Sequence, residues 1–236
     1  MATFRACFLV LLFGCCVAVG SLATAQDVRV GIRNGIVHST VEGDLFYPAL
    51  RFEGGQVQRA FRTGLQVTGF WAVPLSDRFS VQVEAQYAQK GVAIRGEWIP
   101  ESCGGPLVNC FTPSLDGTYQ MSFVQLPVLL AWRQPLGHGI GLRVLAGPSL
   151  DLLVDTRITT ASLQESALPE NALTPMSHQM IGAVGGVEVQ YDVPSGGALQ
   201  LGARYHPALT EIDVIGEEST LRSRAFVLNL GYAFQL

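Results

Sequence analysis

Large apolar side chains recur at every second position along the last stretch of the chain. Between residues 226 and 236 the even-numbered positions hold Phe, Leu or Tyr, and the odd-numbered ones hold smaller or polar residues such as Asn229 and Gly231. Successive side chains of a β-strand point to opposite faces. The pattern therefore predicts a strand with one face suited to lipid and the other to a narrow, polar interior.

The same period of two recurs along the rest of the chain. It predicts seven further strands, near residues 27–38, 60–73, 79–88, 119–133, 139–153, 181–191 and 199–206. Several of them are long enough to cross a membrane when tilted, which takes about 9–11 residues. Aromatic residues such as Trp71, Phe79 and Tyr191 lie toward the segment ends, where the membrane interfaces would be. The rival interpretation is a soluble sandwich or barrel with these aromatics in its core.

Short and long connections alternate between the predicted strands. Residues 74–78, 134–139 and 193–197 are short and rich in Pro, Gly, Ser or Asp, whereas four long connections span residues 39–59, 92–117, 155–177 and 207–222. This alternation is typical of bacterial outer-membrane barrels. We therefore expect an all-β fold, an eight-stranded antiparallel up-and-down transmembrane β-barrel with short periplasmic turns and long extracellular loops.

The N-terminal residues predict export from the cytoplasm. Arg5 precedes an apolar run from Ala6 to Gly20, and small residues follow up to Ala25. This is the layout of a cleaved signal peptide over residues 1–25, which leaves residues 26–236 as one barrel domain in the outer membrane of a Gram-negative-type bacterium. After residue 25 the sequence contains no apolar run of 18 residues that would form a membrane-spanning helix.

Charge and cysteine content narrow the possible partners. The formal net charge is −4, which does not favour binding to nucleic acid. Cys103 and Cys110 are the two cysteines beyond the predicted signal peptide, and an even pair in an exported protein favours a disulfide. A zinc site is the alternative, although two thiols without a nearby His or second pair make a poor one.

Charged residues are predicted to line the barrel interior. Alternation places inward the following residues: Arg29, Arg33, Arg62, Arg143, Arg204, Glu84, Asp151 and Glu188. An eight-stranded barrel is just wide enough for side chains to fill, and unpaired buried charges are costly. We therefore predict a lumen charge network of Arg62, Glu84, Arg143, Glu188 and Arg204 that plugs the barrel. The alternative is a narrow anion-preferring path or small-ligand pocket.

No catalytic, cofactor-binding or metal-binding residues are predicted. Beyond residue 25 the histidines are His38, His138, His178 and His206, and none lies in a recognisable motif. Ser39 and Ser177 adjoin two of them, which invites comparison with lipid-trimming barrel hydrolases. However, neighbours on a strand point to opposite faces, so we expect a protein that is not an enzyme.

Four short segments resemble a known family. They are Val30–Gly35, Phe123–Leu130, Ala146–Leu150 and Arg204-Tyr205 with Ala208–Ile212. In this order they resemble the outer-membrane protein β-barrel domain family, which includes porin-family and PorT-like proteins. The chain departs from the family pattern at Gln125, where an acidic residue is usual, and at Leu236, where the terminal residue is commonly aromatic.

The resemblance implies location more than activity. It implies contact with outer-membrane lipid and insertion by the outer-membrane assembly machinery, which recognises the C-terminal strand. We expect a monomer, with no partner protein indicated. The expected function is a role in envelope structure or surface interaction. The alternatives are a small-solute channel of the same fold and a PorT-like component of protein secretion or envelope assembly.

Overall fold

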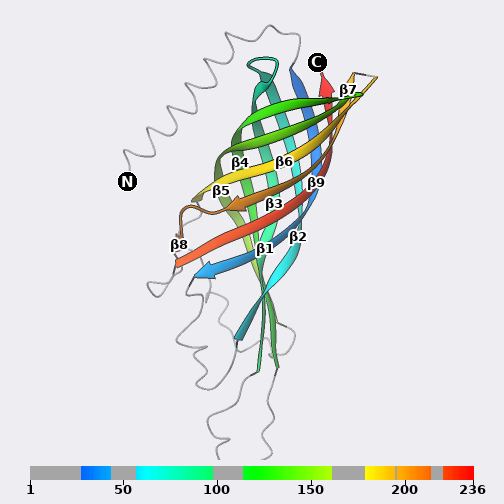
Figure 1. The fold of residues 1–236 in the computed structure, drawn as a ribbon. Coiled ribbons are helices and arrows are strands. Elements are labelled where there is room, and N and C mark those ends of the chain that lie inside the picture. Colours follow the sequence, from blue (N-terminus) through cyan, green and yellow to red (C-terminus); the bar gives the residue numbers. More distant parts are fainter. Residues whose placement is uncertain (1–27, 44–56, 98–113, 161–178, 195, 214–219) are drawn as a thin grey trace, which may run out of the picture.

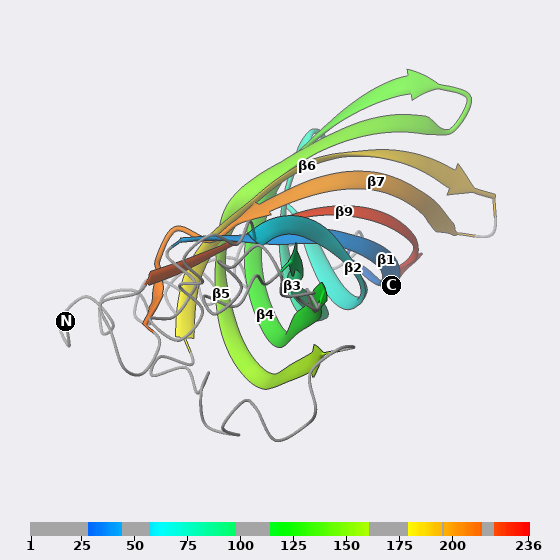
Figure 2. The same ribbon diagram turned by 90° about the horizontal axis from the view of Figure 1, so that it is seen from below.

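The computed structural model describes residues 28–43, 57–97, 114–160, 179–194, 196–213 and 220–236. The strands are β1 (Arg29–Gly43), β2 (Val57–Pro74), β3 (Phe79–Glu97), β4 (Ser114–Gly137), β5 (Ile140–Thr160), β6 (Gln179–Val193), β7 (Gly197–Pro207), β8 (Ile212–Asp213) and β9 (Thr220–Gln235). Each long strand pairs antiparallel with the next, and β1 pairs with β9. This pairing closes the sheet, so the predicted eight-stranded barrel is confirmed (Figures 1 and 2). The two-residue β8 is an addition on the edge of β9.

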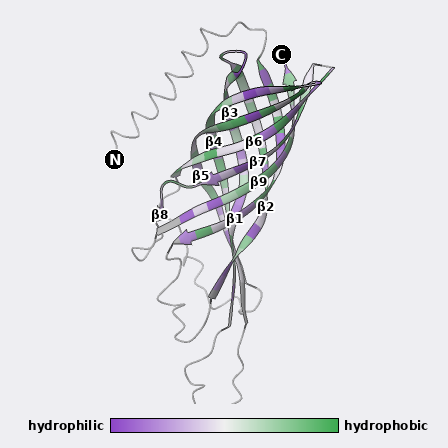
Figure 3. Cartoon of the chain, viewed as in Figure 1, coloured by the Kyte–Doolittle hydropathy of each residue, from purple (hydrophilic) through white to green (hydrophobic). Residues whose placement is uncertain are grey.

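Apolar side chains face outward and polar side chains face inward. On β9, Leu228 is 66% exposed, whereas the inward Asn229 beside it is 4% exposed. On β3, Val83 and Tyr87 are exposed while Gln82, Glu84 and Gln86 are buried. The alternation is visible along the strands in Figure 3. A soluble barrel would bury its apolar face, so this inverted arrangement identifies a barrel built for lipid.

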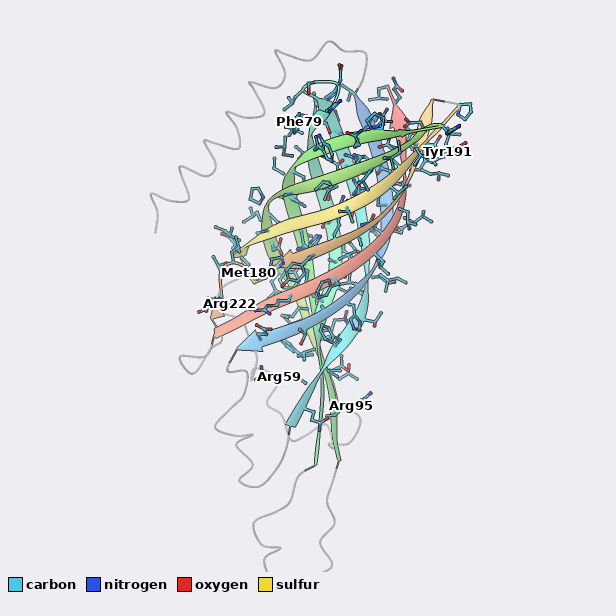
Figure 4. The ribbon with its side chains drawn as sticks, in the orientation of Figure 1. Arg59, Phe79, Arg95, Met180, Tyr191 and Arg222 are labelled. Carbon is cyan, nitrogen blue, oxygen red and sulfur yellow. The ribbon has the colours of Figure 1, made fainter. Side chains whose placement is uncertain are left out.

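The outward apolar band has aromatic residues at both margins. Trp71, Phe79, Tyr191 and Phe234 are exposed near the short turns, and Phe61, Tyr87 and Phe226 are exposed toward the opposite end. Such girdles lie at membrane interfaces. Beyond the second girdle the outward residues become charged, for example Arg59 on β2 and Arg95 on β3 (Figure 4). The apolar band therefore ends before the strands do.

The short turns lie at the end of the barrel that also holds the start of β1 and the C-terminus (Figure 1). The β4–β5 connection is a two-residue loop of His138 (φ 52°) and Gly139 (φ 76°), between the paired residues Gly137 and Ile140. Two positive φ values form the type I′ turn that suits tight hairpins. In bacterial barrels this end faces the periplasm. None of the described residues forms a helix long and apolar enough to cross a membrane.

Candidate functional site in the barrel lumen

Five charged side chains meet in the middle of the barrel. They come from five different strands: Arg33 of β1, Glu84 of β3, Arg143 of β5, Glu188 of β6 and Arg204 of β7. All five are 5% exposed or less. Because contributors lie on both sides of the lumen, the cluster reaches across it. We call these residues the central cluster.

Glu188 is the hub of the central cluster. Its Oε1 accepts hydrogen bonds from Nη1 of Arg33 at 2.7 Å and from Nη2 of Arg204 at 2.6 Å. Its Oε2 accepts one from Nη1 of Arg143 at 3.0 Å. One carboxylate thus binds three guanidinium groups, and charge-assisted bonds of this kind are roughly twice as strong as neutral ones.

Glu84 supplies the second negative charge. Arg204 binds it in a bidentate arrangement, with Nη1–Oε2 at 2.7 Å and Nη2–Oε1 at 3.0 Å, and Nη2 of Arg33 lies 3.1 Å from Oε1. Gln82 and Gln86 also donate hydrogen bonds to this carboxylate. The two buried carboxylates are therefore compensated by ion pairs and by hydrogen bonds from amides, as low-dielectric surroundings require.

Inward-facing glycines provide the room that these long side chains need. A Cβ at Gly231 would lie 2.1 Å from Cγ of Arg33, and one at Gly202 would lie 2.6 Å from Cγ of Glu188. At Gly186 it would lie 2.7 Å from Cγ of Arg204. These distances are far below van der Waals contact. The small residues that alternate with large apolar ones along β6, β7 and β9 thus make space for the central cluster.

A second polar pair and an apolar layer lie on the extracellular side of the central cluster. Nζ of Lys90 is 3.4 Å from Oδ2 of Asp151, which also accepts a hydrogen bond from Gln125. Next to this pair is a buried apolar cluster contributed by β1, β3, β4, β5 and β6: Val41, Val92, Tyr119, Met121, Phe123, Leu153 and Met180. The lumen therefore contains a charged layer followed by a mainly apolar one.

The comparisons with known proteins agree with this geometry. The model of the family described as "Outer membrane protein beta-barrel domain" matches residues 24–214. The chain belongs to this family. No curated protein matches this member of the family.

Among solved structures, this outer-membrane barrel resembles the outer membrane protein OprG of Pseudomonas aeruginosa. The two share 13% identity with a TM-score of 0.52, over 89% of this chain and 98% of OprG. Neisserial surface protein A matches with 11% identity and a TM-score of 0.45, over 88% of this chain and 97% of the other. At these identities the likeness to OprG supports the fold alone.

The structure brings together four of the five residues predicted to form the lumen network of this outer-membrane barrel. The fifth, Arg62, lies elsewhere: its guanidinium donates to Oε1 of Gln120 at 2.6 Å and to the carbonyl of Lys90 at 3.4 Å. Arg33 takes its place in the central cluster, although the alternation alone had only placed it inward. Arg29 instead pairs with Asp192 near the short turns.

Of the remaining candidate residues of this barrel, some lie in the part of the chain that the structure describes and others lie outside it. His38 faces outward, stacked on Phe61, while the hydroxyl of Ser39 points inward and bonds to Gly91, so the two are on opposite faces as expected. His178 lies outside the described residues, as do Cys103 and Cys110, and their predicted disulfide stays a prediction. Among the described residues, no group of three or more His, Cys, Asp or Glu side chains is placed to hold a metal ion.

Proposed function

We propose that this protein is a non-conducting, non-enzymatic outer-membrane scaffold that contributes to envelope structure and presents its extracellular end for surface interaction. The observation that carries the proposal is the central cluster. Five buried side chains from five strands meet in ion pairs across the lumen. An eight-stranded barrel has no spare width around such a cluster.

The apolar layer supports the same proposal. Val41, Tyr119, Met121 and Phe123 are at most 4% exposed and belong to one buried cluster beyond the Lys90–Asp151 pair. A hydrated ion that passed the central cluster would then meet this mainly apolar layer, which offers few groups to replace its water, and apolar layers in a pore oppose ion passage by dewetting. Two successive barriers of different chemistry thus oppose conduction.

The surface role rests on the strands that extend beyond the apolar band. β4 has 24 residues and β5 has 21, about twice the length a spanning strand needs. The outward residues of this extension are polar, among them Arg59, Arg95, Asp155 and Arg157. Loops and strand ends carried on a rigid barrel are where binding residues concentrate.

Single-channel recording tests the proposal. The mature chain is refolded and added to a planar bilayer, and a heat-modifiability gel checks that the barrel has formed. We expect a folded barrel without steady conductance. A steady conductance that falls or changes ion selectivity in Arg143→Ala would refute the scaffold and support the small-solute channel. Copurification with secretion proteins would instead support the PorT-like role.

A further inference from the structure

A cavity of about 350 Å³ lies at the turn end of the barrel, on the periplasmic side of the central cluster. Its lining comes from the turn-side parts of β1 to β7 and from the β2–β3 turn. Phe79 and Tyr191 mark this end of the barrel in Figure 4. The lining residues that matter here are Arg29, Arg133, Arg143, Phe70 and Pro74. The volume is at the lower end of the range for small-molecule sites.

One wall of the cavity is cationic. Arg143, 5% exposed, connects the cavity to the central cluster, and Arg29 and Arg133 lie nearer the rim with a quarter to a third of each side chain exposed. Asp192 pairs with both Arg29 and Arg133. Two arginines thus share one aspartate.

Positive charge exceeds negative charge around the cavity. The central cluster holds three arginines against two glutamates, and the rim pairs two arginines with Asp192. The two further rim charges, Asp77 and Arg78, have opposite signs. Together these residues therefore leave an excess of two positive charges at this end of the lumen.

Two buried polar atoms of the lining have no hydrogen-bond partner among the described residues. They are Oε1 of Gln200, whose residue is 1% exposed, and Nε of Arg133. Buried polar atoms in native structures nearly always have a partner. Both atoms belong to residues that line the cavity and lie next to its arginines.

Apolar groups also line the cavity. Phe70, which is 6% exposed, and Pro74 at the end of β2 are among them. One face of the Phe70 ring is already covered by the guanidinium of Arg33, 4.1 Å from the ring centroid. An inorganic anion would leave these apolar groups without a contact, whereas a molecule with an anionic group and an apolar body would contact both kinds of group.

We propose that this cavity binds a small organic anion that enters from the periplasmic side. Its carboxylate or phosphate group lies between Arg133 and Arg143, which have planar donor arrangements that match such oxyanions. Its apolar body packs against Phe70 and Pro74. The proposal goes beyond the scaffold function and does not depend on it, because binding at the periplasmic mouth requires no passage through the lumen.

Titration with three ligands of similar shape tests the charge requirement. The full-length mature barrel is refolded in a non-ionic detergent and titrated at low salt with benzoate, phenyl phosphate and benzamide, while NMR follows the arginine Nε–H signals. We expect saturable shifts with benzoate, phenyl phosphate or both, and none with the neutral benzamide. The ratio of the two anion affinities tells a carboxylate site from a phosphate site. Equal binding of benzamide, or no saturable shift with either anion, would overturn the proposal.

Three single substitutions test the location. Arg133→Gln should weaken anion binding about tenfold, because it removes a charge-assisted contact. Arg95→Gln is the matched control, since Arg95 lies at the opposite end of the barrel (Figure 4) and should change nothing. Asp192→Asn should strengthen binding severalfold, because it releases Arg29 and Arg133 from their shared anion.

The opposite signs of these effects exclude a merely structural explanation. If Asp192 only held the rim in shape, Asp192→Asn would weaken binding as Arg133→Gln does. Weaker binding in Asp192→Asn, or equal losses in Arg133→Gln and Arg95→Gln, would therefore overturn the assignment. A heat-modifiability gel of each variant verifies that it is folded.

Discussion

Replacing Glu188 with glutamine is expected to destabilise the barrel much more than replacing Arg143 with glutamine. Glu188 binds three arginines, whereas Arg143 binds Glu188 and Oε1 of Gln82 at 2.8 Å. Glu188→Gln leaves three buried arginines with one glutamate. Arg143→Gln leaves two arginines with two glutamates, which balances the charges of the cluster.

The size of the difference follows from these contacts. One pair of unit charges 4 Å apart gains about 4 kcal/mol at an effective dielectric constant of about 20, and desolvation offsets much of this gain. Removing one partner from a buried ion pair typically costs about 3–5 kcal/mol. We expect a loss in that range for Glu188→Gln. For Arg143→Gln we expect about 1–2 kcal/mol, because two hydrogen bonds are lost while the charges of the cluster become balanced.

Urea unfolding of the barrel refolded in phospholipid vesicles, followed by tryptophan fluorescence, measures both losses. The double variant Glu188→Gln/Arg143→Gln restores the original excess of one positive charge, so it should be more stable than Glu188→Gln alone. Equal losses in the two single variants, or a double variant no better than Glu188→Gln, would refute the reasoning. Either result would mean that water in the lumen screens these charges.

Three further predictions concern the lipid face, the lumen glycines and the cysteines. Leu230→Arg, in the middle of the apolar band of β9, should cost about 2–4 kcal/mol in vesicles. Leu136→Arg should cost little, because Leu136, equally exposed (61% against 60%), lies at the turn end of β4. Similar losses in the two variants would argue against the placement of the band. Gly202→Val would place a Cβ 2.6 Å from Cγ of Glu188 and should therefore slow or prevent folding. A heat-modifiability gel measures folding, and normal folding would contradict this packing. Cys103 and Cys110 should resist alkylation until a reductant is added, as mass spectrometry can show, and immediate alkylation would exclude the disulfide.

The sequence predicted the turn ends of the strands better than their opposite ends. β5 was expected over residues 139–153 and spans Ile140–Thr160, and β3 was expected over 79–88 and spans Phe79–Glu97. At the turns, Gly and Pro mark the limits of a strand directly. On β5 the residues after Val154 are polar at successive positions, as at Asp155, Thr156 and Arg157, so the period of two disappears although the strand pairing continues.

The composition of the central cluster could be predicted only in part. Alternation tells which face a side chain occupies, but the height at which it lies depends on the register between strands. Arg33 is paired with Thr68, and Arg62 lies six residues farther along β2, about 20 Å at the rise of a strand. The pairing of β2 with β3 also shifts in register between Phe61 and Gln66, and no local sequence signal marks this shift. Arg62 was therefore assigned to the right face and the wrong layer.

The central cluster and the periplasmic cavity share Arg143, and this connection explains the charge imbalance of the lumen. A buried cluster with one cation too many is costly unless a counter-charge is nearby. Asp192 does not provide it, because it already pairs with Arg29 and Arg133. An organic anion bound in the cavity beside Arg143 would balance the extra positive charge of the central cluster without entering the cluster. On this view the cavity is a pocket closed at its inner end. The ion pair between Arg143 and Glu188 separates the anion from the extracellular side, and so does the apolar layer beyond it. If both proposals hold, binding at the periplasmic mouth and the absence of conduction are two consequences of the same arrangement of arginines.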